Sequence, residues 1–134
     1  MSGRPGSATD RHGRRLGLRH REPGADGPVV ELSVTDDHLN GAGIAHGGVL
    51  FSALDEAVAI VANAPRPGSV LVTATIHCLR PALPGDDLSV WVETVKAGRT
   101  VSVYEARLTR ADDLLAVMTA QTASTRTAAP DGGG

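Results

Sequence analysis

The stretch that decides the fold runs from His38 to Glu56 and reads HLNGAGIAHGGVLFSALDE. It begins as a polar, glycine-rich loop and changes, after a His-Gly-Gly step, into an apolar run. In a helix, the apolar residues of this run would point to nearly every side, which is typical of a buried helix. We therefore predict a buried helix from about Val49 to Asn63, ended by Pro65, Pro67 and Gly68.

Asp55 lies two turns inside the predicted helix. Its helical face is otherwise short or apolar and consists of Gly48, Phe51, Ser52 and Ala59. A carboxylate in apolar surroundings costs free energy, so Asp55 is a candidate for chemistry. The alternative is a structural Asp that hydrogen-bonds a neighbouring loop or a partner subunit. Glu56, roughly 100° further round the helix, is predicted to face solvent or an interface.

The turn before the helix supplies polar groups for the same site. Gly47 and Gly48 could simply let the chain turn, or their N–H groups could form an oxyanion hole at the helix start. Together with Asp55 they indicate an acyl-transfer site. Asn40 could hold a water molecule or shape the loop. His46 could orient the acyl substrate or stabilise the loop.

The remaining polar candidates have simpler explanations. The five His residues show no metal-ligand spacing, so no metal site is expected. His12, His20 and His38 have no partner pattern, and His77 is predicted at a surface or interface. Residues 98–100, Gly-Arg-Thr, are explained by a hairpin turn but could also bind a phosphate.

The composition predicts one globular domain in a chain of 134 residues, 41% of them hydrophobic and 21% charged. Only 2% are aromatic and the net charge is −2, which argues against nucleic-acid binding. Residues 1–21 hold six Arg and one Asp, so this segment carries +5 and the remainder −7. Such a segment is either a solvated terminus or a basic arm for an anionic partner.

The single cysteine, Cys78, excludes an intrachain disulfide and favours a reducing compartment. It falls in an apolar strand, where we expect a packed core thiol rather than a nucleophile. No segment has the apolar length of a membrane span, and the N-terminus lacks the apolar stretch of a secretory signal. We therefore expect a cytoplasmic protein that does not bind membranes.

Turn signals divide the chain into a flexible arm (1–14), a folded domain (15–126) and a disordered tail (127–134). Six strands are expected, at Leu16–Glu22, Val29–Val34, Ser69–Arg80, Leu88–Lys96, Thr100–Thr109 and Leu114–Thr125. Short links favour antiparallel neighbours, so we expect the last four strands to form a meander. The order of elements predicts an α+β fold in which a curved antiparallel sheet wraps around one central helix.

Four sequence patterns resemble a known family. Residues 40–48 (Asn-Gly-x-Gly-x-x-His-Gly-Gly) and 50–55 (Leu-Phe-Ser-x-Leu-Asp) are similar to the signature of hotdog-fold acyl-CoA thioesterases. Within the 4-hydroxybenzoyl-CoA thioesterase superfamily, they resemble the PaaI-like branch. Residues 79–81 (Leu-Arg-Pro) and 96–100 (Lys-x-Gly-Arg-Thr) match further family landmarks. The resemblance covers about residues 15–126.

The resemblance implies a hotdog fold that forms a homodimer and often a tetramer, as a dimer of dimers. It also implies hydrolysis of acyl-CoA thioesters without metal or cofactor, CoA being part of the substrate. Asp55 would be the catalytic carboxylate, acting as base on water or as nucleophile, and Gly47, with Gly48, would donate N–H groups to the thioester oxygen. Asn40 and His46 would position water and thioester and would face the Asp of the neighbouring subunit.

The resemblance also implies a CoA site and leaves two other functions open. The expected CoA contacts are Arg80, Gly98, Arg99 and Thr100. In the strand after the helix, some relatives carry a Ser or Thr near the attacking water, and Thr73 is the nearest candidate here. At position 59, some distant relatives have a Thr where this chain has Ala59. The other functions are a hotdog hydratase or dehydratase, which would use His46 and Asp55, and a non-catalytic acyl-CoA sensor.

Overall fold

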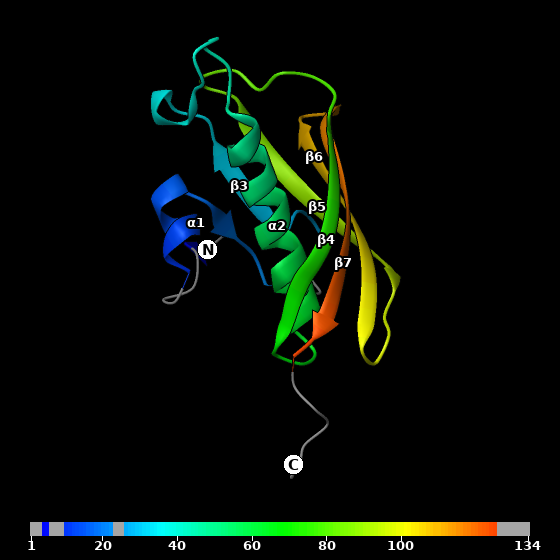
Figure 1. The fold of residues 1–134 in the computed structure, drawn as a ribbon. Coiled ribbons are helices and arrows are strands. Elements are labelled where there is room, and N and C mark those ends of the chain that lie inside the picture. Colours follow the sequence, from blue (N-terminus) through cyan, green and yellow to red (C-terminus); the bar gives the residue numbers. More distant parts are fainter. Residues whose placement is uncertain (1–3, 6–9, 23–25, 126–134) are drawn as a thin grey trace.

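The computed structural model describes residues 4–5, 10–22 and 26–125. Its elements in chain order are β1 (Arg4–Pro5), α1 (Arg11–Leu16), β2 (Arg19–His20), β3 (Val30–Ser33), the 3-10 turn η1 (Asp36–His38), α2 (Gly47–Asn63), β4 (Ser69–Cys78), β5 (Asp87–Lys96), β6 (Val101–Arg110) and β7 (Asp113–Ser124). The strands form one antiparallel sheet in the order β1-β2-β3-β5-β6-β7-β4, which curves around α2 (Figure 1). The predicted architecture, a curved antiparallel sheet around one central helix, is confirmed.

The central helix α2 packs on the sheet through small and branched side chains. Its buried residues are Val49, Leu50, Ala53, Leu54, Ala57, Val58 and Ala62. Ala53 and Ala57 are fully buried, and their small side chains let the sheet approach closely. The helix begins at Gly47, two residues before the predicted Val49. Within the described ranges, no helix is long and apolar enough to cross a membrane.

The predicted four-strand meander is only partly correct. β5, β6 and β7 pair in sequence through short hairpins, as expected. β4 instead pairs with β7 and forms the far edge of the sheet, while β3 pairs with β5. The segment between β4 and β5 explains this difference, because its residues 79–86 are too many for a tight hairpin and include Pro81 and Pro84.

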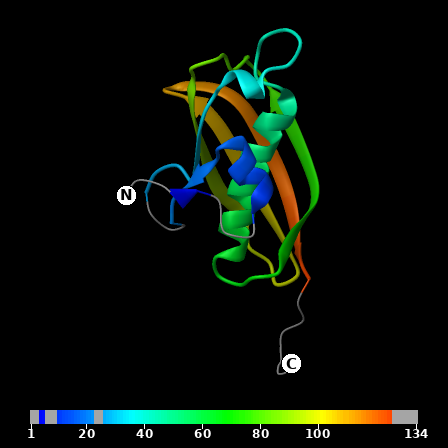
Figure 2. The same cartoon turned by 90° about the vertical axis from the view of Figure 1, so that its left-hand side faces the viewer.

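The N-terminal part is more ordered than predicted from Asp10 onward. Where the sequence suggested a flexible arm and then a strand at Leu16–Glu22, the structure has α1 and only the two-residue strand β2. Asp10 caps α1 by accepting a hydrogen bond from the Gly13 N–H (3.0 Å), and Gly17 ends it with φ +81°. α1 lies beside α2 (Figures 1 and 2). The predicted tail at 127–134 lies outside the described residues.

Cys78 is exposed, so the prediction of a core thiol is wrong. It continues the inward face of Ala74 and Ile76 on β4, but an open cavity lies beside it where packed core was expected. β4 is also an edge strand whose outer side carries the exposed side chains of Val70 and Val72. A single chain therefore leaves apolar surface uncovered along this edge.

Candidate active site

The N-terminus of α2 is shaped by His46. His46 is the N-cap, in an extended conformation (φ −60°, ψ 138°), and its Nδ1 accepts a hydrogen bond from the Gly48 N–H at 2.8 Å. That bond uses the Gly48 N–H and requires the His46 tautomer whose proton is on Nε2. Within the described part of the chain, the Gly47 N–H has no hydrogen-bond partner. Gly47 is therefore the free donor of the predicted glycine pair.

Asn40 organises the loop that precedes α2. Its Oδ1 accepts hydrogen bonds from the N–H groups of Ala42 (2.8 Å) and Ile44 (3.3 Å). Its own N–H donates to the Ile44 carbonyl oxygen (2.8 Å), which closes the loop as a tight turn. The carboxamide oxygen is thus used by the loop, and its NH₂ group is the part that could reach a ligand.

The first cavity, which we call the Gly47 cavity, has a volume of about 340 Å³. Its lining residues are Asn40, Ile44, Ala45, Gly47, Leu50, Cys78, Leu79, Arg80, Pro81 and Ala82. It brings together three predicted site residues, Asn40, Gly47 and Arg80. Its walls are largely apolar, and the free N–H of Gly47 lies at the positive end of α2. Such a cavity suits a carbonyl oxygen or another group with negative charge.

The second cavity, the Asp55 cavity, has a volume of about 560 Å³. Its lining residues are Asp10, His12, Ser52, Asp55, Glu56, Ala59, Ile60 and Asn63. Burial raises the pKa of the half-buried Asp55, and the negative charge of Asp10 adds to this, whereas His12 lowers it. Neither Gly47 nor Asn40 lines this cavity.

Asp55 and the free Gly47 N–H cannot act on one carbonyl group within a single chain. They are eight positions apart along α2, which places them roughly 12 Å apart along the helix axis. In the transition state, the thioester carbonyl oxygen and the attacking oxygen are both attached to the same carbonyl carbon, so the N–H donor and the catalytic carboxylate must lie close together. Each group of one chain is therefore at most half of a site. A complete site would need the Gly47 N–H of one subunit and the Asp55 of another.

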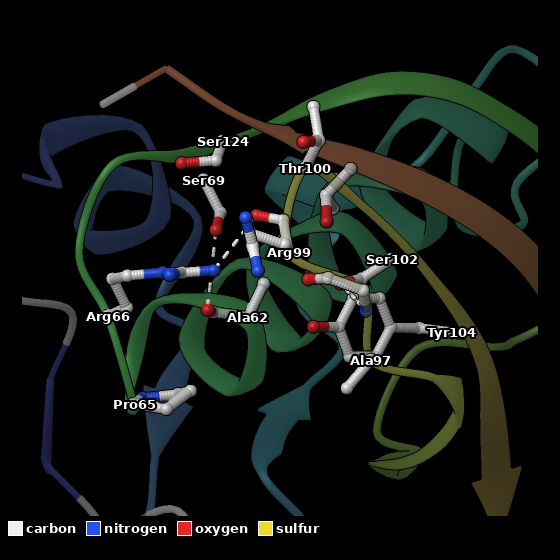
Figure 3. A pocket seen from close by; sticks show the side chains of 12 residues that line it. Ala62, Pro65, Arg66, Ser69, Ala97, Arg99, Thr100, Ser102, Tyr104 and Ser124 are labelled. Carbon is white, nitrogen blue, oxygen red and sulfur yellow. Dashed lines mark hydrogen bonds between the residues drawn. The ribbon is translucent and has the colours of Figure 1, made fainter. Parts of the chain in front are cut away.

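The third cavity, the Arg99 cavity, is shown in Figure 3 and has a volume of about 360 Å³. Its lining residues are Ala62, Pro65, Arg66, Ser69, Ala97, Gly98, Arg99, Thr100, Ser102, Tyr104, Thr122 and Ser124. Three predicted CoA contacts, Gly98, Arg99 and Thr100, are thus neighbours. A Cβ on Gly98 would collide with the Val101 carbonyl oxygen, so the turn requires glycine.

Sequence reasoning missed Arg66. Its Nη2 donates a hydrogen bond to the Arg99 carbonyl oxygen at 2.9 Å, which puts a second cation beside the Arg99 cavity. The two arginines are 33 positions apart in the sequence, and no local spacing could have linked them. Thr73 lies exposed on β4 and lines none of the three cavities.

Sequence reasoning also missed the groups around Glu56, which was expected to face solvent or an interface. In the structure Glu56 is half-buried and forms a hydrogen bond with Asp10. Burial is the main cause that raises the pKa of Glu56 to about 8. The same hydrogen bond lowers the pKa of Asp10, so the pair shares one proton and Glu56 carries it. Among the described residues, no group of three His, Cys, Asp or Glu side chains is arranged to hold a metal ion.

The chain is similar to known thioesterases. Residues 42–117, more than half of the chain, match the family model of the thioesterase superfamily. The acyl-coenzyme A thioesterase PaaI of Escherichia coli is 36% identical over 80 residues, which span 60% of this chain and 57% of that protein.

Solved structures extend the similarity. The Escherichia coli PaaI structure has a TM-score of 0.79 at 25% identity and covers 91% of this chain and 89% of that chain. A Streptococcus mutans protein bound to acetyl-CoA has a TM-score of 0.67 at 30% identity, covering 74% of this chain and 82% of that chain. The predicted hotdog fold and the PaaI-like resemblance are confirmed, and the chain belongs to the thioesterase superfamily.

Proposed function

We propose that the protein hydrolyses acyl-CoA thioesters to a free acid and CoA. The observation that carries this proposal is the Gly47 N–H, which has no partner among the described residues, at the N-terminus of the buried helix that also bears Asp55. The acyl-CoA thioesterase named among the relatives and the acetyl-CoA bound to the Streptococcus mutans protein support it.

In this proposal the Gly47 N–H donates to the thioester carbonyl oxygen, where negative charge develops during attack. One such preorganised donor typically contributes about 3 kcal/mol to the transition state. As a general base, the Asp55 of a second subunit takes a proton from water while the water oxygen bonds to the carbonyl carbon. The C–S bond then breaks, and the departing thiolate takes up a proton. As a nucleophile, Asp55 would instead form an anhydride that water hydrolyses.

The remaining predicted residues take supporting roles. Asn40 presents its NH₂ group to the Gly47 cavity, and His46 holds the loop and the helix start in place. Thr73 is proposed to lie near the attacking water. The CoA phosphates would bind the cations Arg80 and Arg99 beside Gly98 and Thr100, and we add Arg66 to this set. No metal ion or cofactor takes part.

We further propose that the working unit is a homodimer, paired again as a dimer of dimers. The roughly 12 Å between Gly47 and Asp55 in one chain supports a site completed by the partner's half. The open β4 edge, with Val70 and Val72 exposed by 48% and 54%, is the surface proposed for this contact. The single exposed cysteine fits the cytoplasm, which we propose as the location.

Release of CoA thiol from a panel of acyl-CoA esters tests the proposed hydrolysis. We expect the full chain to hydrolyse at least one ester class, and Asp55→Asn to lower kcat about 100-fold or more. Asp112→Asn, in the exposed β6–β7 turn, is the matched control and should behave as the unaltered protein.

The same panel separates the alternatives. Equal hydrolysis by the unaltered protein and Asp55→Asn would overturn the mechanism. Binding of CoA esters without any hydrolysis would instead identify a sensor. Water addition to an enoyl-CoA, without thiol release, would identify a hydratase.

A further inference from the structure

We propose that α1 is part of the active site and that His12 is a positioning residue for Asp55. The proposal rests on the proposed function, because it assigns a role relative to the Asp55 chemistry. It concerns a segment that the sequence predicted to be a flexible arm. Three features carry it: the anchoring of α1, the reach of His12 and the charges that surround Asp55.

α1 is fixed to the domain at several points. Gly13 is buried, and a Cβ there would collide with Oε1 of Glu56, so glycine allows the close approach of α1 to α2. Asp10 hydrogen-bonds Glu56 from the start of α1. Beyond its end, His38 Nε2 donates to the Leu16 carbonyl oxygen (2.7 Å), and Leu18 is buried. The position of His12 is therefore determined by contacts on both sides of it.

His12 reaches from α1 to the helical face that carries Asp55. Its Nε2 lies 2.9 Å from Oγ of Ser52, a residue 40 positions away in the sequence. Ser52 precedes Asp55 by three positions, so both side chains lie on one face of α2. His12, Ser52 and Asp55 line the same cavity. When His12 is protonated it donates to Ser52 Oγ, and the Ser52 hydroxyl proton is then free to donate into the cavity.

The charges around Asp55 make this cation useful. The charged groups facing it are Asp10, the N-cap residue of α1, His12 from α1 and Glu56 from α2. Burial and the negative charge of Asp10 raise the pKa of Asp55, and the positive charge of His12 opposes them. Asp55 must be ionised to act as base or nucleophile. Within the described residues, His12 is the group whose charge favours that state.

The consequence concerns the acid limb of the pH profile, which is the rise of activity at low pH, and its position should depend on His12. Activity rises with pH as Asp55 ionises, and the His12 cation moves this rise to lower pH. Removing the cation should move it to higher pH. Because His12 is exposed, solvent screening keeps the displacement to about 0.5–1 pH unit.

The variants are His12→Gln, which keeps a hydrogen-bond donor without charge, and His12→Lys, which restores a cation. Arg15→Gln removes an exposed cation from the same helix and is the matched control. For each, kcat/KM is measured from pH 4.5 to 8.5. Independently of turnover, the Asp55 carboxyl carbon is titrated by NMR in the unaltered protein and in His12→Gln.

We expect the acid limb of His12→Gln to lie about 0.5–1 pH unit higher, which is a threefold to tenfold loss of kcat/KM at low pH and little loss at pH 8. His12→Lys should restore the limb and Arg15→Gln should not move it. Unchanged profiles and an unchanged Asp55 titration in His12→Gln would overturn the inference while hydrolysis by the unaltered protein stands. A displaced titration in a protein without hydrolysis would support the inference and overturn the proposed function.

Discussion

The N-terminal end of α2 and the face that carries Asp55 belong to one helix, but they are assembled from different distances along the chain. The N-terminal end of α2, which we call the donor end, is shaped mainly by the loop just before it, where most hydrogen bonds within residues 38–48 span two to eight positions. One longer bond, from the Ala45 N–H to the Ala82 carbonyl oxygen (2.8 Å), ties this loop to the segment after β4. The Asp55 face is completed by α1, whose His12 contacts Ser52 across 40 residues.

The two regions also differ in charge. Among the residues that the structure describes, no carboxylate lines the Gly47 cavity, where the polar groups are an N–H, a carboxamide and the cation of Arg80. Three carboxyl groups, those of Asp10, Asp55 and Glu56, line the Asp55 cavity. Their mutual repulsion is relieved because Glu56 keeps its proton to about pH 8 and His12 adds a positive charge. We call the surface with Asp10, Asp55 and Glu56 the acid face. The donor end and the acid face are separated in one chain, and their opposite polarity suits them to meet across a subunit contact.

The largest expected effect concerns the donor end. Gly47→Pro removes the free N–H but suits the first position of a helix, where proline is favoured, and the extended His46 is compatible with a following proline. We expect kcat for acyl-CoA hydrolysis to fall about 100-fold to 1000-fold with little change in Tm.

Gly47→Ala is the control for this substitution. It keeps the N–H, and a Cβ at this position meets nothing within 4 Å, so kcat should stay close to that of the unaltered protein. Equal activity of the Ala and Pro variants would show that the Gly47 N–H does not serve the reaction.

The same contrast explains what could be predicted from the sequence. The helix, the strands after it and the loop with Asn40, His46 and Gly47 follow from local patterns, and all were predicted within a few residues. The pairing of β4 with β7 was not predicted, because the long connection between β4 and β5 does not determine which strand β4 pairs with. The roles of His12, Glu56 and Arg66 depend on contacts between distant segments, which leave no periodic or spacing signal.

A second prediction addresses the acid face. In the folded protein Glu56 keeps its proton up to about pH 8, whereas in the unfolded chain, with the ordinary pKa of 4.5, it loses the proton at lower pH. The stability that Glu56 contributes is therefore fully present below pH 4.5 and is lost as the pH rises to about 8. Asp10 has a lowered pKa, so its own contribution is also stabilising but has the opposite pH dependence: it is present above the ordinary pKa and is lost as the pH falls through the lowered pKa.

Glu56→Gln mimics the protonated carboxyl and should remove this loss. We expect the variant to exceed the unaltered protein in stability at pH 8 by about 1–2 kcal/mol, after allowance for partial solvent exposure. Thermal unfolding at pH 5, 6.5 and 8 measures it, with Glu93→Gln on the exposed side of β5 as control. A variant whose Tm falls with pH as steeply as that of the unaltered protein would contradict the protonated Glu56.

The smallest expected effect separates capping from catalysis at the donor end. His46→Ala removes the acceptor for the Gly48 N–H, and loss of such a cap costs about 1 kcal/mol, visible as a lower Tm. His46→Asn supplies a side-chain oxygen that caps well, so we expect it to restore the Tm and most of kcat. Restored stability without restored kcat would instead indicate that His46 contacts the substrate, and the donor end would then contain a second reacting group besides Gly47.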